Sequence, residues 1–89
     1  MTAPVQITLL TQTSCGMCQL AKEILARLGN EYPLSVTVVD LHTDEGKRLA
    51  AGAGVLFAPG VLVDGQPFSY GRLSERKLRR LLDRRAAVR

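Results

Sequence analysis

Cys15 and Cys18 are the residues whose type and spacing point most directly to chemistry, in the run Cys15-Gly16-Met17-Cys18. The sequence holds 2 cysteines in all. A pair separated by two residues closes too short a loop to act as a fold-stabilising cross-link. Two sulfurs at this spacing serve either thiol–disulfide exchange or the binding of a soft metal ion.

The segments on either side of the pair favour exchange. Val5–Leu10 is rich in β-formers and predicts a strand, and the apolar residues from Cys18 to Leu28 recur every three or four positions, which predicts a helix. Cys15 then lies at or just before a helix N-terminus, where free N–H groups and the helix dipole stabilise a thiolate and lower the thiol pKa. We therefore expect Cys15 to be the nucleophile and Cys18 to be the thiol that resolves the mixed disulfide.

Gly16 and Met17 are predicted to face the substrate. Gly16 leaves space beside the sulfur, and Met17 offers an adaptable apolar side chain to a partner protein. Metal binding is the alternative use of the cysteines. A structural zinc site needs four ligands, and His42 is the one other soft or imidazole candidate beside the two cysteines. A two-coordinate copper(I) site, in contrast, needs only the two thiolates. A copper(I)- or zinc-binding metallochaperone-type module is therefore the second candidate function.

The rest of the chain predicts, in order, a strand at 34–40, a short helix through 47–50, strands at 61–63 and 66–70, and a last helix. Ser74 is the expected cap of that helix, and its apolar stripe consists of Leu78, Leu81, Leu82 and Ala86. The strand at 34–40 is β-branched and is expected to be buried. Thr43 or Asp44 is the expected cap of the short helix, and Asp64-Gly65 favours a two-residue type I′ turn. Phe68 and Tyr70 of this hairpin are expected to cover the core rather than to line a cleft. The order β-α-β-α-β-β-α predicts an α/β protein with a four-stranded mixed sheet flanked by helices.

Composition predicts one domain spanning residues 1–89, because 89 residues are too few for two cores. The net charge of +4 is uneven: residues 72–89 hold eight basic and two acidic side chains, and residues 1–71 hold four basic and six acidic ones. The basic side chains of this segment are Arg72, Arg76, Lys77, Arg79, Arg80, Arg84, Arg85 and Arg89. We expect a solvated helix face rather than a nucleic-acid site, because no aromatic residue interleaves them. No membrane association is expected without a long apolar run, and we expect a cytoplasmic protein.

Two motifs stand out in this order of elements: Cys15-Gly-Met-Cys18 after the first strand, and Ala58-Pro59 immediately before a hairpin. Together they resemble the glutaredoxin and small thioredoxin-like redoxin family, which has the thioredoxin fold. The resemblance covers nearly the whole chain. It implies that Pro59 is a cis-proline beside the cysteines and that the backbone of Ala58 pairs with an extended substrate. It also implies a thiol-disulfide oxidoreductase or electron carrier that acts as a monomer. Its substrates would be disulfide-containing proteins or low-molecular-weight thiols. A thiol reductant such as glutathione, or a reductase, would recharge it, and no bound cofactor is needed.

The residues between the cysteines differ from both typical members of that family. Gly16 and Met17 stand where a typical glutaredoxin has Pro-Tyr and a typical thioredoxin has Gly-Pro. The second resemblance is to the heavy-metal-associated domain of copper chaperones, which has the order β-α-β-β-α-β and a methionine where this chain has Thr13.

Overall fold

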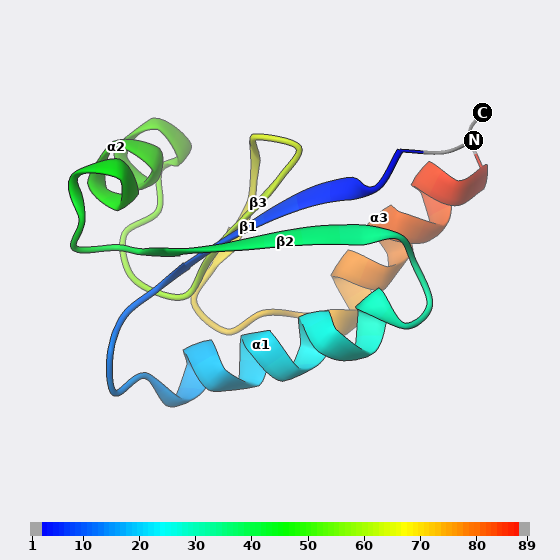
Figure 1. Ribbon diagram of the computed structural model, residues 1–89, viewed down its shortest axis with the longest axis horizontal. Helices are drawn as coiled ribbons and strands as arrows, with labels where there is room; N and C mark the ends of the chain where they lie inside the picture. Colours follow the sequence, from blue (N-terminus) through cyan, green and yellow to red (C-terminus); the bar gives the residue numbers. More distant parts are fainter. Residues whose placement is uncertain (1–2, 88–89) are drawn as a thin grey trace.

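The computed structural model describes residues 3–87, and Arg89 of the basic segment lies outside them. Four strands and three helices follow one another in the predicted order (Figure 1). Their bounds are β1 Val5–Thr11, α1 Gly16–Gly29, β2 Leu34–Asp40, α2 Asp44–Ala53, β3 Gly60–Val63, β4 Gln66–Tyr70 and α3 Glu75–Ala87. The prediction of an α/β, thioredoxin-like order of elements is confirmed.

The four strands form one mixed sheet in the order β2-β1-β3-β4. β1 and β2 are parallel over seven paired positions, from Val5 opposite Leu34 to Thr11 opposite Asp40. β3 runs antiparallel to both β1 and β4. The β3–β4 turn has positive φ at its two central residues, 50° at Asp64 and 81° at Gly65, as the predicted type I′ turn requires.

The helices cover both faces of the sheet. α1 and α3 pack on one face and α2 packs on the other (Figure 1). The larger core lies under α1 and α3, with Ile7, Leu9, Ala21, Ile24, Leu25, Leu28, Val61, Val63, Leu73, Leu78 and Leu82 all buried. The smaller core, under α2, consists of Leu10, Val39, Ala50, Val55 and Leu62. Alternate residues of β1 therefore point into two different cores, which fixes its register.

The expectation that strand 34–40 is buried is wrong. β2 is an edge strand in which only Val39 is buried, and Val36 and Val38 are 42% and 49% exposed. A run of β-branched residues indicates burial on both faces only for a strand in the interior of a parallel sheet. Here a surface groove separates α1 from β2, and Val36 and Val38 line it together with Leu25.

α2 extends three residues beyond the predicted short helix, although it contains two glycines. Thr43 caps it, accepting a hydrogen bond from the backbone N–H of Gly46 at 3.0 Å, and Gly54 ends it with φ 70°. Gly46 has a packing role. A Cβ at this position would overlap the backbone oxygen of Asp40, so the absence of a side chain lets α2 lie against the end of β2.

Candidate active site

Cys15 and Cys18 form a disulfide at the start of α1, with their Cα atoms 5.2 Å apart. Cys15 is the N-cap residue of the helix, with extended backbone angles. Its sulfur accepts a hydrogen bond from the backbone N–H of Cys18 at 3.1 Å. The first turn of α1 carries no acidic side chain that would offset the positive end of the helix dipole. The predicted placement of Cys15 at the helix N-terminus is thus confirmed.

The two cysteines differ in accessibility. Cys15 is partly exposed, whereas Cys18 is 1% exposed. Gly16 is exposed, with no atom of another segment within 4 Å of where a Cβ would stand, and Met17 is 41% exposed. A reagent approaching the disulfide from solvent therefore meets Cys15, with Gly16 and Met17 beside it.

The Ala58-Pro59 bond is cis, as the resemblance implied. Both residues are buried, and the carbonyl oxygen of Pro59 accepts a hydrogen bond from the N–H of Gly71 at 2.8 Å. The next residue, Gly60, pairs with Leu10 near the end of β1, and a short loop leads from that end to Cys15. The strand register thus brings the cis-proline turn and the disulfide to the same end of the sheet.

Exposed apolar side chains precede that turn. Leu56 is 76% exposed and Phe57 is 50% exposed. The ring of Phe57 packs edge-on against the ring of Tyr70, with centroids 5.1 Å apart and planes at 90°. Gly71 lies beside this pair, and a Cβ there would stand 3.1 Å from the Phe57 ring. The end of β4 therefore supports an aromatic pair next to the cis-proline turn.

The sequence did not single out Leu56 and Phe57. For Phe68 and Tyr70, the two aromatic residues of the hairpin, the sequence predicts packing against the core. Phe68 does pack against the larger core, but Tyr70 is 42% exposed, so the expectation is wrong for Tyr70. One signal was available. Leu56 and Phe57 fall in a short segment between two elements, outside any helical or strand periodicity, where large apolar side chains have no core to enter.

The two segments that carry the disulfide and the cis-proline turn contain no charged residue. No charged residue occurs between Val5 and Ala21, or between Gly54 and Val63. Among residues 3–87, no three His, Cys, Asp or Glu side chains are grouped so that they could hold a metal ion. The two sulfurs are therefore the reactive groups of this site, and the side chains next to them in sequence are uncharged.

These features define a thioredoxin-fold protein with a cysteine pair of the redox type. The glutaredoxin-like domain family (DUF836) matches residues 6–83, and the chain belongs to that family. An uncharacterized protein of Mycobacterium tuberculosis is 32% identical over 79 residues, which cover 83% of this chain and 78% of that protein. The thioredoxin of Methanocaldococcus jannaschii is 30% identical over 61 residues, covering 68% of this chain and 72% of the thioredoxin.

A longer relative and a solved structure are also similar to this chain. The NADPH-dependent thioredoxin reductase 3 of Arabidopsis thaliana is 33% identical over 57 residues, but these span only 11% of its length and 64% of this chain. The structure of a mutant thioredoxin from Halobacterium salinarum has a TM-score of 0.70 at 24% identity, over 92% of this chain and 74% of that one. It shares the fold. None of the described helices has the length and apolar character needed to span a membrane.

Proposed function

We propose that this protein is a thiol-disulfide oxidoreductase that reduces disulfide bonds in proteins. One observation carries the proposal: Cys15 is accessible at a helix N-cap with an N–H aimed at its sulfur, whereas Cys18 is buried behind it. The same N–H and the helix dipole favour a thiolate on Cys15 once the disulfide is reduced.

The reaction proceeds in two exchange steps. The Cys15 thiolate attacks one sulfur of the substrate disulfide, an S–S bond forms between them, and the other substrate sulfur leaves as a thiolate and takes up a proton. Cys18 then loses its proton and attacks the Cys15 sulfur. This releases the second substrate thiol and leaves the Cys15–Cys18 disulfide. Two electrons have passed to the substrate, so the two sulfurs need no bound cofactor.

The residues around the disulfide would hold the substrate during these steps. The backbone of Ala58 next to Pro59 pairs with an extended substrate segment in this proposal, adding a short strand at the end of the sheet. Gly16 leaves room for the substrate sulfur beside Cys15, and Met17 packs against the apolar side chains that flank it.

The oxidised protein must be recharged by a dithiol or thiol reductant, and we include glutathione or a flavin-dependent reductase in the proposal. The similarity to part of an NADPH-dependent thioredoxin reductase supports a reductase as partner. We assign the protein to the cytoplasm, where the thiol pool keeps such pairs reduced. It acts there as a monomer, because the exchange needs only one Cys15 and one Cys18.

The test is to trap the intermediate. Cys18→Ser should accumulate a mixed disulfide between Cys15 and a model protein substrate such as insulin, visible on a non-reducing gel and lost on adding dithiothreitol. Cys15→Ser is the matched control and should trap far less, because Cys18 is buried. Equal trapping by both variants, or trapping by neither, would refute the proposal. Copper(I) binding that both substitutions weaken equally would then favour the metallochaperone alternative.

A further inference from the structure

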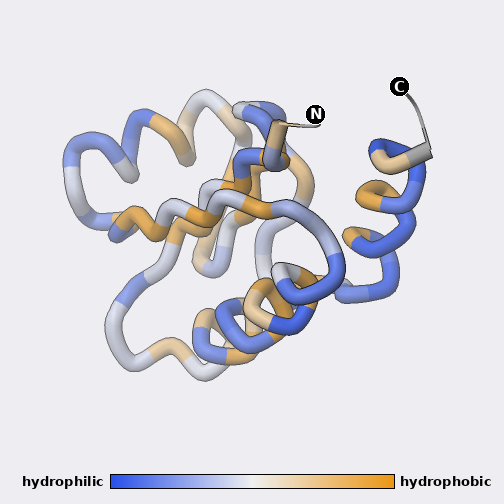
Figure 2. Tube along the Cα trace, turned by 45° about the vertical axis from the view of Figure 1, so that its right-hand side comes forward, coloured by the Kyte–Doolittle hydropathy of each residue, from blue (hydrophilic) through white to orange (hydrophobic). Residues whose placement is uncertain are grey.

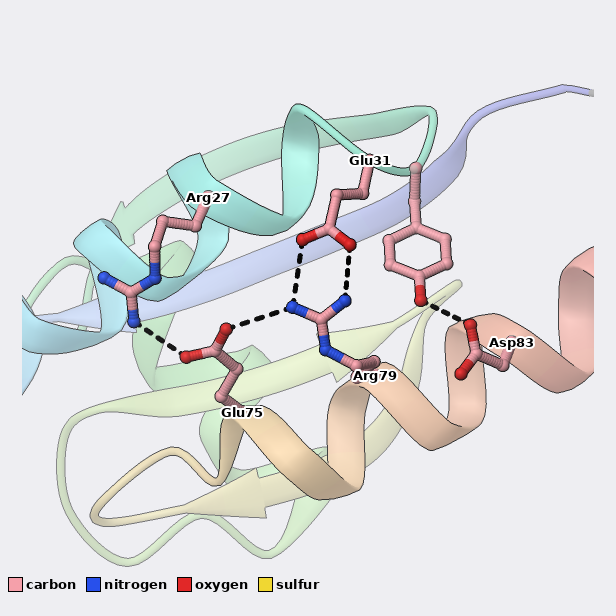
Figure 3. A network of polar contacts seen from close by, with 6 residues as sticks. Arg27, Glu31, Glu75, Arg79 and Asp83 are labelled. Carbon is pink, nitrogen blue, oxygen red and sulfur yellow. Dashed lines mark hydrogen bonds and ion pairs between the residues drawn. The ribbon is translucent and has the colours of Figure 1, made fainter.

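The charges of the C-terminal helix are divided between two sides. Toward α1, the basic side chains are paired (Figure 3). Arg79 donates hydrogen bonds to both carboxylate oxygens of Glu31, at 2.5 and 2.9 Å. The carboxylate of Glu75 accepts one hydrogen bond from Arg27 at 2.7 Å and one from Arg79 at 3.3 Å. The hydrogen bond from Arg27 holds the pKa of Glu75 below its usual value. This side of α3 is therefore neutralised within the molecule.

The other acidic groups near α3 also have partners within the molecule. Asp83 accepts a hydrogen bond from the hydroxyl of Tyr32, and Asp64 pairs with Arg85. Asp83 keeps its negative charge, because a hydroxyl is a neutral partner, but its carboxylate is turned toward Tyr32, on the side of the helix that carries Arg79 (Figure 3).

The outer side is basic and has no ion pair among residues 3–87. Its members, which we call the basic face, are Arg72, Arg76, Lys77, Arg80 and Arg84, all exposed. Arg76, Arg80 and Arg84 recur every four residues, so they lie along one side of the helix, opposite the buried Leu78 and Leu82. Figure 2 shows this division, with α3 orange toward the body of the molecule and blue on its outer side.

The basic face begins next to the disulfide site. Arg72 directly follows Gly71, whose N–H donates to the carbonyl oxygen of Pro59. From there α3 leads away over 13 residues, about 20 Å at the usual helical rise. The segments that hold the disulfide and the cis-proline turn carry no charged side chain, so a partner bound there meets the cations of Arg72 and α3 as a separate, charged surface.

We propose that the basic face is a docking surface for acidic proteins that carry the substrate disulfide. Such a partner would present an apolar segment at Cys15 and an acidic segment along α3. This inference rests on the proposed function and adds the partner's chemistry to it. An acidic protein fits better than a nucleic acid, because the face leads to a redox site and no exposed aromatic side chain interleaves the cations of α3.

The experiment compares synthetic peptides that contain one intramolecular disulfide. One peptide carries a tail of six glutamates on a short Gly-Ser spacer, a second carries glutamines in their place, and 2-hydroxyethyl disulfide serves as a neutral substrate without a tail. At about 0.05 M ionic strength, we expect the reduced protein to have a kcat/KM for the glutamate peptide about tenfold above that for the glutamine peptide. The reason is that electrostatic steering of this kind raises association rates by about 10-fold or more. At about 1 M salt, where the screening length is about 3 Å, the preference should disappear.

A charge-matched pair of variants separates a local surface from a general effect of net charge. Arg76→Glu with Arg80→Glu should abolish the preference for the glutamate peptide and leave 2-hydroxyethyl disulfide reduction unchanged. Lys47→Glu with Arg48→Glu changes the net charge equally on α2, across the sheet, and should keep the preference. Equal losses in both double variants, or no preference in the native protein, would overturn the proposal. Tighter binding of a mixed-sequence 20-nucleotide single strand than of the glutamate peptide would assign the face to nucleic acid instead.

The two proposals fail separately. A protein that reduces 2-hydroxyethyl disulfide without preferring the acidic peptide retains the proposed function and loses only the docking surface. A protein that reduces none of the three substrates loses the proposed function itself.

Discussion

Replacement of Gly46 by alanine tests the packing of α2 against the end of β2. The added Cβ would overlap the backbone oxygen of Asp40 and stand 2.9 Å from the Cα of Leu41. Both obstacles are backbone atoms, which cannot rotate aside. Alanine gains about 0.5–1 kcal/mol over glycine in a helix, but forcing atoms into a filled space costs about 1–3 kcal/mol or more. We expect a net loss, because the overlap here is with a peptide group rather than with a flexible side chain.

Gly52 in the same helix provides the control. A Cβ at Gly52 meets nothing within 4 Å, so Gly52→Ala should stabilise the protein by about 0.5–1 kcal/mol. For a domain of this size 1 kcal/mol shifts Tm by about 4–8 °C, so the two variants should depart from the native Tm in opposite directions. The measurement is thermal unfolding of the oxidised protein by circular dichroism. A Tm for Gly46→Ala equal to or above the native value would show that α2 does not pack as described.

Three further substitutions test the core and the polar contacts. Leu78 is 0% exposed in the larger core, and Leu78→Ala should cost about 2–5 kcal/mol in urea unfolding; a loss within experimental error would contradict that packing. The hydrogen bond from Arg79 lowers the pKa of Glu31, so its stabilisation is present above the unfolded pKa and is lost as pH falls through the folded one. The urea midpoint of Glu31→Gln should therefore drop less than that of the native protein between about pH 7 and about pH 3. The hydrogen bond to Asp83 raises the pKa of Tyr32, so its stabilisation is present below the unfolded pKa and is lost as pH rises through the folded one. Tyr32→Phe should be less stable than the native protein at neutral pH and approach it at strongly alkaline pH, and a constant difference would contradict the contact.

The parts of the fold that sequence predicted are those set by local rules. The cap of α1 at Cys15, the turn at Asp64-Gly65 and the cap of α3 at Ser74 each depend on residues within a few positions of one another. Hydrophobic periodicity likewise placed Leu78 and Leu82 in the core.

The parts that sequence did not predict depend on contacts between distant segments. β2 lies at the edge of the sheet because β1 pairs with β2 on one side and with β3 on the other. No residue within 34–40 specifies this order of strands. The pairing of Phe57 with Tyr70 joins two segments across the cis-proline turn. The basic segment looked uniform, because only the packing of α3 against α1 shows that Arg79 is paired and that Arg80 is not.

The open edge at β2 bears on how the protein behaves in concentrated solution. From Leu34 to Val39 this strand contains no proline and no charged residue, and its Val36 and Val38 side chains are exposed. An open edge of this kind can pair with the same strand of another molecule. The opposite edge is interrupted by Pro67 and by a register shift. Repulsion between molecules of net charge +4 opposes such stacking, and its range shrinks from about 10 Å at 0.1 M salt to about 3 Å at 1 M. Concentrated stocks should therefore stay clear in dilute buffer and turn cloudy as salt is added.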